Sequence, residues 1–142
     1  MLTPHILQPE MLYKIDLPLF LTKVEAGFPS PADDYIEDKL DLNQLMVKRP
    51  AATFFVRVSG QSMVGAGIQH NDILVVDRSI KASHKAIVVA SVNGEFTVKR
   101  YYVEANKQIL KPENPKFKPI VINENDQFEV WGVVTYVIHQ AR

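Results

Sequence analysis

An Asn-Gly dipeptide at 93–94 lies between two runs that are rich in β-branched and aromatic residues, 86–92 and 95–102. Asn-Gly favours a two-residue loop with positive φ at both positions, and such a loop closes an antiparallel hairpin. The register of this hairpin places Val88 opposite Lys99. The hairpin therefore predicts that the second half of the chain folds as an antiparallel β-sheet.

Other runs in the chain have the same β-type composition. They occupy 53–58, 73–77 and 128–139, with one short strand at about 108–111 inside the loop-rich segment 105–127. Gly132 interrupts the last long run, where a β-bulge or a sharp bend would fit. We expect a mainly β fold, built as a curved, barrel-like antiparallel sheet.

The segment 1–31 differs from the rest because it contains five of the nine prolines. Each proline removes a backbone donor and disfavours helix at the residue before it. We therefore expect an extended arm that lies on its own domain or on a partner subunit. Helix-start signals at Ser30-Pro31 and Asp41 predict two short helices after the arm, at about 32–38 and 42–47.

Composition excludes several classes of protein. The 16 Lys and Arg balance the 16 Asp and Glu, which argues against a protein that mainly grips phosphate backbones. Cysteine is absent, so disulfides, thiolate zinc sites and thiol nucleophiles are excluded. No apolar run approaches the roughly 20 residues that span a bilayer. We expect a soluble cytoplasmic protein without a membrane anchor.

Ser62 follows a predicted strand in the Gly-rich stretch 59–67. A glycine there allows a tight turn, and the small residues after it leave room for another chain to approach. The serine could present its hydroxyl at the strand end, with the backbone N–H groups of Ser62 and Met63 placed to hold an oxyanion. A structural turn explains the same local sequence equally simply.

Lys99 shares its predicted sheet face with the apolar residues Val88, Ala90 and Val92. Desolvation in such a setting favours the neutral amine and lowers the pKa of a lysine. A neutral amine can take the proton of a serine hydroxyl. The alternative is a surface lysine whose stem lies along the sheet.

The four histidines offer other chemistry, but their positions are scattered (His5, His70, His84 and His139). They show no metal-ligand spacing, so we expect neither a metal site nor a cofactor. A Ser–His–Asp triad with Ser62 stays open at this stage, because triads are assembled in space rather than in sequence.

Three ordered motifs resemble the LexA/UmuD family of self-cleaving proteins: SGQSM at 59–63, NDILVVD at 71–77 and GEFTVKR at 94–100. The stretches 26–46 and 128–142 are also similar to UmuD-like members of that family. Several motifs in the same order over more than a hundred residues make the resemblance specific, whereas a single SxM would not.

The resemblance implies a serine–lysine peptidase whose substrate is its own arm. Ser62 matches the family nucleophile, Lys99 matches the general base, and Ala26-Gly27 stands at the family's cleavage position. The chain would then comprise an arm, 1–31, and a peptidase domain, 32–142. Whether cleavage occurs within one chain or across a dimer is left open.

Two residues depart from the family pattern. Asn71 stands where a glycine commonly precedes the aspartate, and Gly65 replaces a commoner polar residue beside the nucleophile. Asparagine tolerates left-handed backbone, so we expect the turn at 71 to persist. Gly65 leaves the finer geometry of the serine loop open.

The resemblance also implies partners. UmuD-like proteins are homodimers that the RecA filament on single-stranded DNA stimulates during the SOS response, and they then join the polymerase subunit UmuC for error-prone translesion synthesis. LexA and the phage repressors carry a helix-turn-helix domain, for which we see no counterpart before Ala26, so we expect no sequence-specific DNA binding. A non-catalytic β module that regulates a polymerase by docking and subunit exchange is the competing hypothesis.

Overall fold

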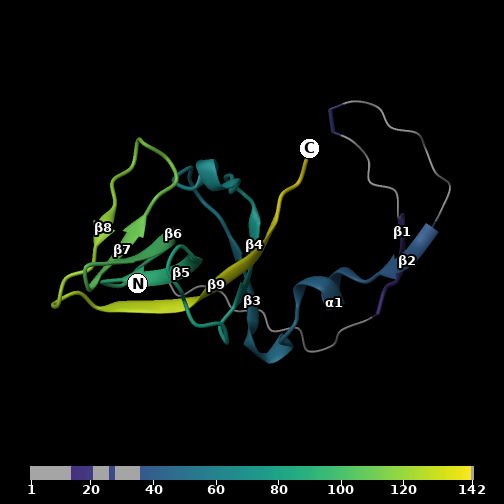
Figure 1. Cartoon of the computed structure of the whole chain (residues 1–142), viewed down its shortest axis with the longest axis horizontal. Helices are drawn as coiled ribbons and strands as arrows, with labels where there is room; N and C mark the ends of the chain where they lie inside the picture. Colours follow the sequence, from purple (N-terminus) through teal and green to yellow (C-terminus); the bar gives the residue numbers. More distant parts are fainter. Residues whose placement is uncertain (1–13, 21–25, 28–35, 142) are drawn as a thin grey trace. The chain divides into compact units, whose positions relative to one another are not determined.

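The computed structural model describes residues 14–20, 26–27 and 36–141. They fall into two compact units, one within Glu10–Lys48 and the other within Arg49–Arg142, drawn in sequence colours in Figure 1. Most of the arm predicted at 1–31 lies outside the described residues. No helix in the described part of the chain is long and apolar enough to cross a bilayer.

The smaller unit contains a two-stranded antiparallel sheet and one short helix. Strand β1 (Leu17–Phe20) pairs with β2 (Ile36–Leu40). Helix α1 (Leu42–Met46) follows, and the Asp41 side chain caps it by accepting from the Asn43 amide at 3.0 Å. The helix predicted at 42–47 is therefore confirmed, together with its capping residue.

The helix predicted at 32–38 is wrong where the structure describes it, because residues 36–38 belong to β2. Residues 32–35 lie outside the described residues. A helix of two turns gains few hydrogen bonds for the cost of its nucleation. Pairing with β1 satisfies the same backbone groups in a ladder, and this long-range partner is not visible in the local helix-start signal.

The larger unit is one seven-stranded antiparallel sheet. Among the described residues its order is β3-β4-β9-β5-β6-β7-β8, with β3 and β8 as the edge strands, so this sheet is not closed into the barrel-like form that we expected. The strands are β3 (Thr53–Arg57), β4 (Ile73–Asp77), β5 (Ile87–Val92), β6 (Glu95–Glu104), β7 (Lys107–Lys111), β8 (Ile120–Val121) and β9 (Phe128–Ile138). The mainly β, antiparallel fold is confirmed, and within this larger sheet the two-residue β8 is the one described strand that was not predicted.

The central hairpin has the predicted turn and register. Asn93 and Gly94 have φ of 51° and 85°, as a two-residue loop of this kind requires. Strands β5 and β6 pair so that Val88 lies opposite Lys99. The position of Lys99 on its sheet face therefore follows directly from the turn.

Buried side chains form two clusters around this sheet. One cluster joins strands β3, β4 and β5 to the loop after β3; its members are Phe54, Val58, Met63, Ile68, Leu74, Val76 and Val89. The other lies along the central hairpin and β7, and consists of Val88, Ala90, Tyr101 and Leu110. The alternation of Val88 and Val89 between the clusters is the two-residue period of a strand that is covered on both faces.

Strand β9 lies between β4 and β5 in the sheet (Figure 1). Its pairing is irregular at two points, one with each neighbour. The bulge predicted at Gly132 is present one residue earlier, because Val89 pairs with Gly132 while Ala90 pairs with Val130. Gly132 itself has another role. A Cβ built there would lie 2.7 Å from Val76 Cγ1 and 3.0 Å from the Asp77 carbonyl oxygen, so β4 approaches too closely for a side chain.

We predict that Gly132→Ala lowers the free energy of unfolding by about 1–3 kcal/mol, the usual cost of overpacking a core. Urea denaturation monitored by circular dichroism measures this change. Gly27→Ala is the control, since a Cβ there meets nothing within 4 Å and the backbone is outside the left-handed region. A Gly132→Ala variant as stable as the unmodified chain would contradict the close approach.

Candidate active site

Ser62 lies in the loop that leaves β3 and enters a short 3-10 turn, η2 (Val64–Ala66). Gly60 begins the loop with a φ of 92°, in the left-handed region that glycine adopts freely. Met63 and Ile68 are almost fully buried in the first core cluster and hold the loop against the sheet. The Ser62 side chain is left half-buried beside strand β6.

Lys99 on β6 brings its amine to this loop. Its Nζ atom lies 3.0 Å from Ser62 Oγ, 2.6 Å from Thr97 Oγ1 and 3.1 Å from the Val98 carbonyl oxygen. The residue is 9% exposed, so Lys99 is not the surface lysine of the alternative interpretation. The structure therefore brings together the two side chains that the sequence singled out.

The buried position changes the acid–base behaviour of Lys99. Desolvation by burial lowers the pKa of the Lys99 amine below its ordinary value. No carboxylate contacts Nζ among the described residues, so nothing there stabilises the ammonium form by charge. The site thus favours a neutral amine in contact with a hydroxyl.

The loop between β7 and β8 holds the serine loop from the other side. The Glu113 amide donates to the Ser62 carbonyl oxygen at 2.8 Å, and the Gly65 amide donates to the Glu113 carbonyl oxygen at 2.8 Å. Asn114 Nδ2 donates to the Gln61 carbonyl oxygen at 2.9 Å. Three hydrogen bonds therefore join the two loops on both sides of Ser62.

The two departures from the family pattern have local explanations. Asn71 has a φ of 74°, so the predicted left-handed turn is present. At Gly65 a Cβ would lie 2.6 Å from the Glu113 carbonyl oxygen. A side chain at 65 would thus push against the backbone that holds Ser62, and glycine fits the close contact between the loops.

Ala26 and Gly27, expected at the cleavage site, lie in the other compact unit. Both residues are exposed and form a bend. A Cβ built on Gly27 would meet nothing within 4 Å, so this part of the chain is sterically open.

The histidines described by the structure hold other positions. His70 Nδ1 accepts from the Gly60 amide at 3.0 Å, and His84 Nδ1 accepts from the Val103 amide at 3.1 Å. No described histidine hydrogen-bonds to Ser62, so the triad that the sequence left open is not formed within the described part of the chain. His5 lies outside it, and the described residues contain no cluster of three or more metal-ligating side chains.

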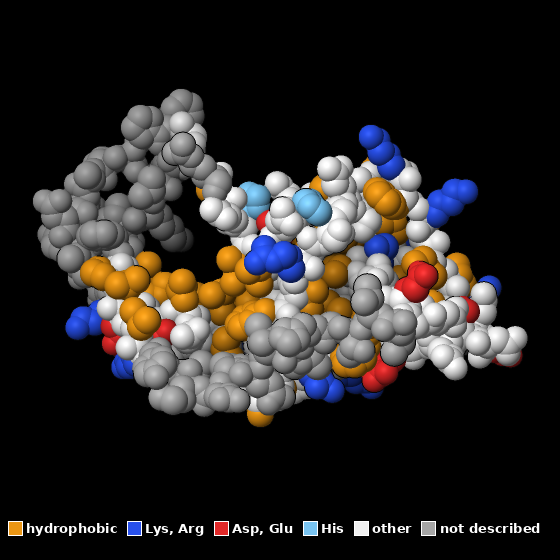
Figure 2. All heavy atoms as spheres, turned by 180° about the vertical axis from the view of Figure 1, so that it is seen from behind, with side chains coloured by type: hydrophobic (Ala, Val, Ile, Leu, Met, Phe, Trp, Pro, Cys, Tyr) orange, Lys and Arg blue, Asp and Glu red, His pale blue; other side chains and the backbone are white. Residues whose placement is uncertain are grey.

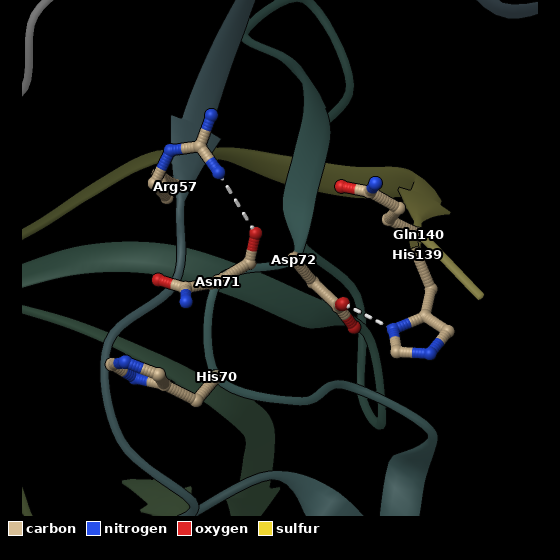
Figure 3. Close-up of a pocket in the computed structure, with 6 residues that line it drawn as sticks. All are labelled: Arg57, His70, Asn71, Asp72, His139 and Gln140. Carbon is tan, nitrogen blue, oxygen red and sulfur yellow. Dashed lines mark hydrogen bonds and ion pairs between the residues drawn. The ribbon is translucent and has the colours of Figure 1, made fainter. Parts of the chain in front are cut away.

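A second polar site surrounds a buried carboxylate that the sequence analysis missed. Asp72 is 2% exposed, and its Oδ1 lies 2.6 Å from Nδ1 of His139. Desolvation by burial acts to raise the pKa of Asp72, but hydrogen bonds from the Gln69 amide and His139 hold it below its usual value. Figure 3 shows this pair in a pocket of about 570 Å³, lined by Arg57, His70, Asn71, Asp72, His139 and Gln140.

Charge on the surface is dispersed. On the face in Figure 2, Lys and Arg side chains stand apart among hydrophobic and uncharged groups and form no continuous stripe. This face therefore offers no extended track for a phosphate backbone.

Sequence reasoning assigned no role to Thr97 or to the loop at 113–114. Thr97 could have been identified, because it lies two residues before Lys99 and so shares its sheet face. Nothing local marks Glu113 and Asn114, since their function is to present backbone and amide groups to a loop about fifty residues away.

We predict that Lys99→Met removes the cost of burying the amine and is at least as stable as the unmodified chain near neutral pH. The pKa of Lys99 is depressed in the folded state, so between that pKa and about 10.4 the unfolded chain binds more protons than the folded one. The folded state of the unmodified chain therefore becomes more stable as pH rises through this range. The advantage of Lys99→Met should therefore shrink as pH rises. Urea unfolding at several pH values measures it, with exposed Lys107→Met as control; an advantage that grows with pH would contradict the burial argument.

Comparisons with known proteins identify the family of this chain. Residues 18–135 match the family described as Peptidase S24-like. The chain is 49% identical over 127 residues to protein ImpA of Salmonella typhimurium, covering 88% of this chain and 85% of the relative. It is 46% identical over 121 residues to protein MucA of Escherichia coli, covering 84% and 82%.

A more distant relative carries the LexA name itself. LexA repressor 1 of Geobacter sulfurreducens is 41% identical over 103 residues, which are 72% of this chain and 50% of the repressor. The family match covers most of the chain, and the alignments with ImpA and MucA cover 88% and 84% of it. The chain therefore belongs to the S24 peptidase family, as a UmuD-like member of the LexA/UmuD group of self-cleaving serine peptidases.

Proposed function

We propose that Ser62 is the nucleophile and Lys99 the general base of a self-cleaving peptidase that removes its own arm between Ala26 and Gly27. The observation that carries the proposal is the 3.0 Å distance between Lys99 Nζ and Ser62 Oγ inside a desolvated site. Serine is a weak nucleophile unless a neighbouring base takes its proton. A lysine can be that base only when its amine is neutral.

The other two contacts of Lys99 support the direction of the proton transfer. A neutral amine has two N–H donors and one lone pair. Thr97 Oγ1 and the Val98 carbonyl oxygen accept the two N–H groups, which leaves the lone pair for the hydroxyl proton of Ser62. Thr97 thus orients the base.

Cleavage then follows two balanced steps. Lys99 Nζ takes the hydroxyl proton while Oγ attacks the Ala26 carbonyl carbon, and the resulting ammonium returns that proton to the departing Gly27 amine. Water next hydrolyses the ester between Ser62 and Ala26, leaving a carboxylate on the released segment. The bend at 26–27 is exposed and sterically open, which suits a peptide bond that must be approached by Ser62 Oγ.

The amides of Ser62 and Met63 are our candidates for the oxyanion hole. Within the described residues neither amide donates a hydrogen bond to another protein group. Both belong to the loop that carries Oγ, so they remain close to the carbonyl oxygen on which negative charge develops.

In the cell, we assign this activity to SOS mutagenesis in the cytoplasm. By its membership of the UmuD-like group, the chain would act as a homodimer and be stimulated by the RecA filament on single-stranded DNA. The shortened product would join a UmuC-type polymerase subunit for translesion synthesis. We retain residues 1–31 as the cleavable arm and 32–142 as the peptidase domain.

We predict that Ser62→Ala abolishes shortening of the chain, and that Lys99→Ala slows it by about 10²–10⁴-fold, the usual contribution of a general base. Intact-mass spectrometry before and after incubation with RecA, ATP and single-stranded DNA detects loss of residues 1–26. Ser59→Ala, in the same loop, and Lys107→Ala, on β7, are matched controls and should cleave normally. A Ser62→Ala chain that still breaks at the same bond would refute the assignment, and an unmodified chain whose mass never changes would favour the non-catalytic docking module.

We also predict that spontaneous cleavage without RecA accelerates as pH rises above neutrality. The active form of Lys99 is the neutral amine, whose fraction grows about tenfold per pH unit below the pKa and then levels off. Because burial depresses that pKa, the plateau should begin below the ordinary pKa of lysine. Initial rates at fixed ionic strength measure the profile, and a rate independent of pH would exclude Lys99 as the base.

A further inference from the structure

The imidazole of His70 is hydrogen-bonded to the loop that carries Ser62. The Gly60 amide donates to His70 Nδ1 at 3.0 Å, two residues before the serine. Gly60 is also the residue at which the chain turns, with its left-handed φ of 92°. A bond at this amide therefore acts at the hinge of the nucleophile loop.

His70 stands on a rigid support. The Asn71 amide donates to the Val58 carbonyl oxygen at 2.8 Å, and the Val58 amide donates to the Asp72 carbonyl oxygen at 2.8 Å. The buried Asp72 carboxylate accepts from the Gln69 amide at 2.7 Å. The turn at 69–72 is thus fixed to the end of β3, and the imidazole connects it to the start of the serine loop.

The hydrogen bond specifies one protonation state of the ring. A nitrogen that accepts from an amide carries no proton, so Nδ1 is bare and the neutral ring holds its proton on Nε2. In Figure 3 the His70 ring points away from the Asp72–His139 pair, so the two histidines use different partners. Protonated imidazole has donors at both nitrogens and would set a donor against the Gly60 amide.

We propose that neutral His70 is a positioning residue for the nucleophile: it accepts the Gly60 amide and thereby holds the loop that presents Ser62 to Lys99. The inference rests on the proposed function of those two side chains. His70 touches no reacting atom and acts only through the backbone at Gly60. The other titratable or charged residues that line the same pocket are Arg57 of β3, Asp72 of the turn and His139 after β9, and the His70 ring points away from the last two.

This role has a consequence for the pH dependence of cleavage. Protonation of Lys99 alone gives a slope of one in a plot of log rate against pH. A ring protonated on both nitrogens cannot accept from the Gly60 amide, so protonation of His70 would break this bond and add to that slope. As pH falls, the unmodified chain should therefore lose activity more steeply than a chain in which residue 70 cannot take up a proton.

Three full-length variants test the role. His70→Asn places an amide oxygen near the position of Nδ1 without a titrating group, and should cleave within about twofold of the unmodified chain at pH 8, with a slope of one at lower pH. His70→Ala removes the acceptor and should be about two- to tenfold slower at pH 8, the effect of one lost hydrogen bond. His84→Asn is the matched control, because His84 Nδ1 accepts the Val103 amide in the same way on another strand; it should keep the rate and slope of the unmodified chain.

A second measurement separates this proposal from the proposed function. In the Ser62→Ala chain, which should not shorten, the ¹⁵N–¹H signals of Gly60 and of position 62 should change together with the signals of the His70 ring when the pH is varied. If these signals change together but the unmodified chain is never shortened, the proposed function fails while the positioning of the loop by His70 stands. Two results would overturn the proposal. One is amide signals of Gly60 and position 62 that stay fixed while the His70 ring signals change. The other is a His70→Ala variant with the cleavage rate and pH slope of the unmodified chain.

Discussion

The functional site depends on one physical constraint, the burial of the Lys99 amine against the Ser62 hydroxyl. Burial lowers the pKa of the amine, and no carboxylate among the described residues contacts it to reverse that effect. The same desolvation that makes lysine costly to bury raises the fraction of its amine that is neutral at a given pH. An exposed lysine at the same distance from the hydroxyl would stay protonated and could not take its proton.

The loop that carries Ser62 is held beside Lys99 by contacts from three parts of the chain. Met63 and Ile68 anchor its loop in the core, the segment at 113–114 bonds it on the far side, and His70 accepts the amide of Gly60. The first contact is side-chain packing and the other two are hydrogen bonds to backbone groups of the loop, and together they leave the Ser62 side chain half-buried beside β6. Such support agrees with the need of a nucleophile for a fixed position with an unhindered reacting atom.

The sequence predicted features that depend on interactions between residues close in the chain, and it failed for those that depend on distant residues. The register that places Lys99 opposite Val88 is set by a two-residue turn and a strand period of two, so local reasoning recovered it. The segment 36–38 was mispredicted as helix because its partner β1 lies about twenty residues away. The approach of Ser62 to Lys99 spans 37 residues and depends on the order of the strands, so only the family resemblance suggested it.

The glycines of the larger unit show the same limit in another form. Gly94 lies in a turn that requires its positive φ of 85°, and the Asn-Gly pair predicts this turn from the local sequence. Gly132 and Gly65 are instead demanded by neighbours distant in sequence, Val76 and Asp77 of β4 in one case and the backbone of Glu113 in the other. A departure such as Gly65 is therefore not a weakened version of the family site. It is the residue that lets the β7–β8 loop come close enough to bond the backbone on both sides of Ser62.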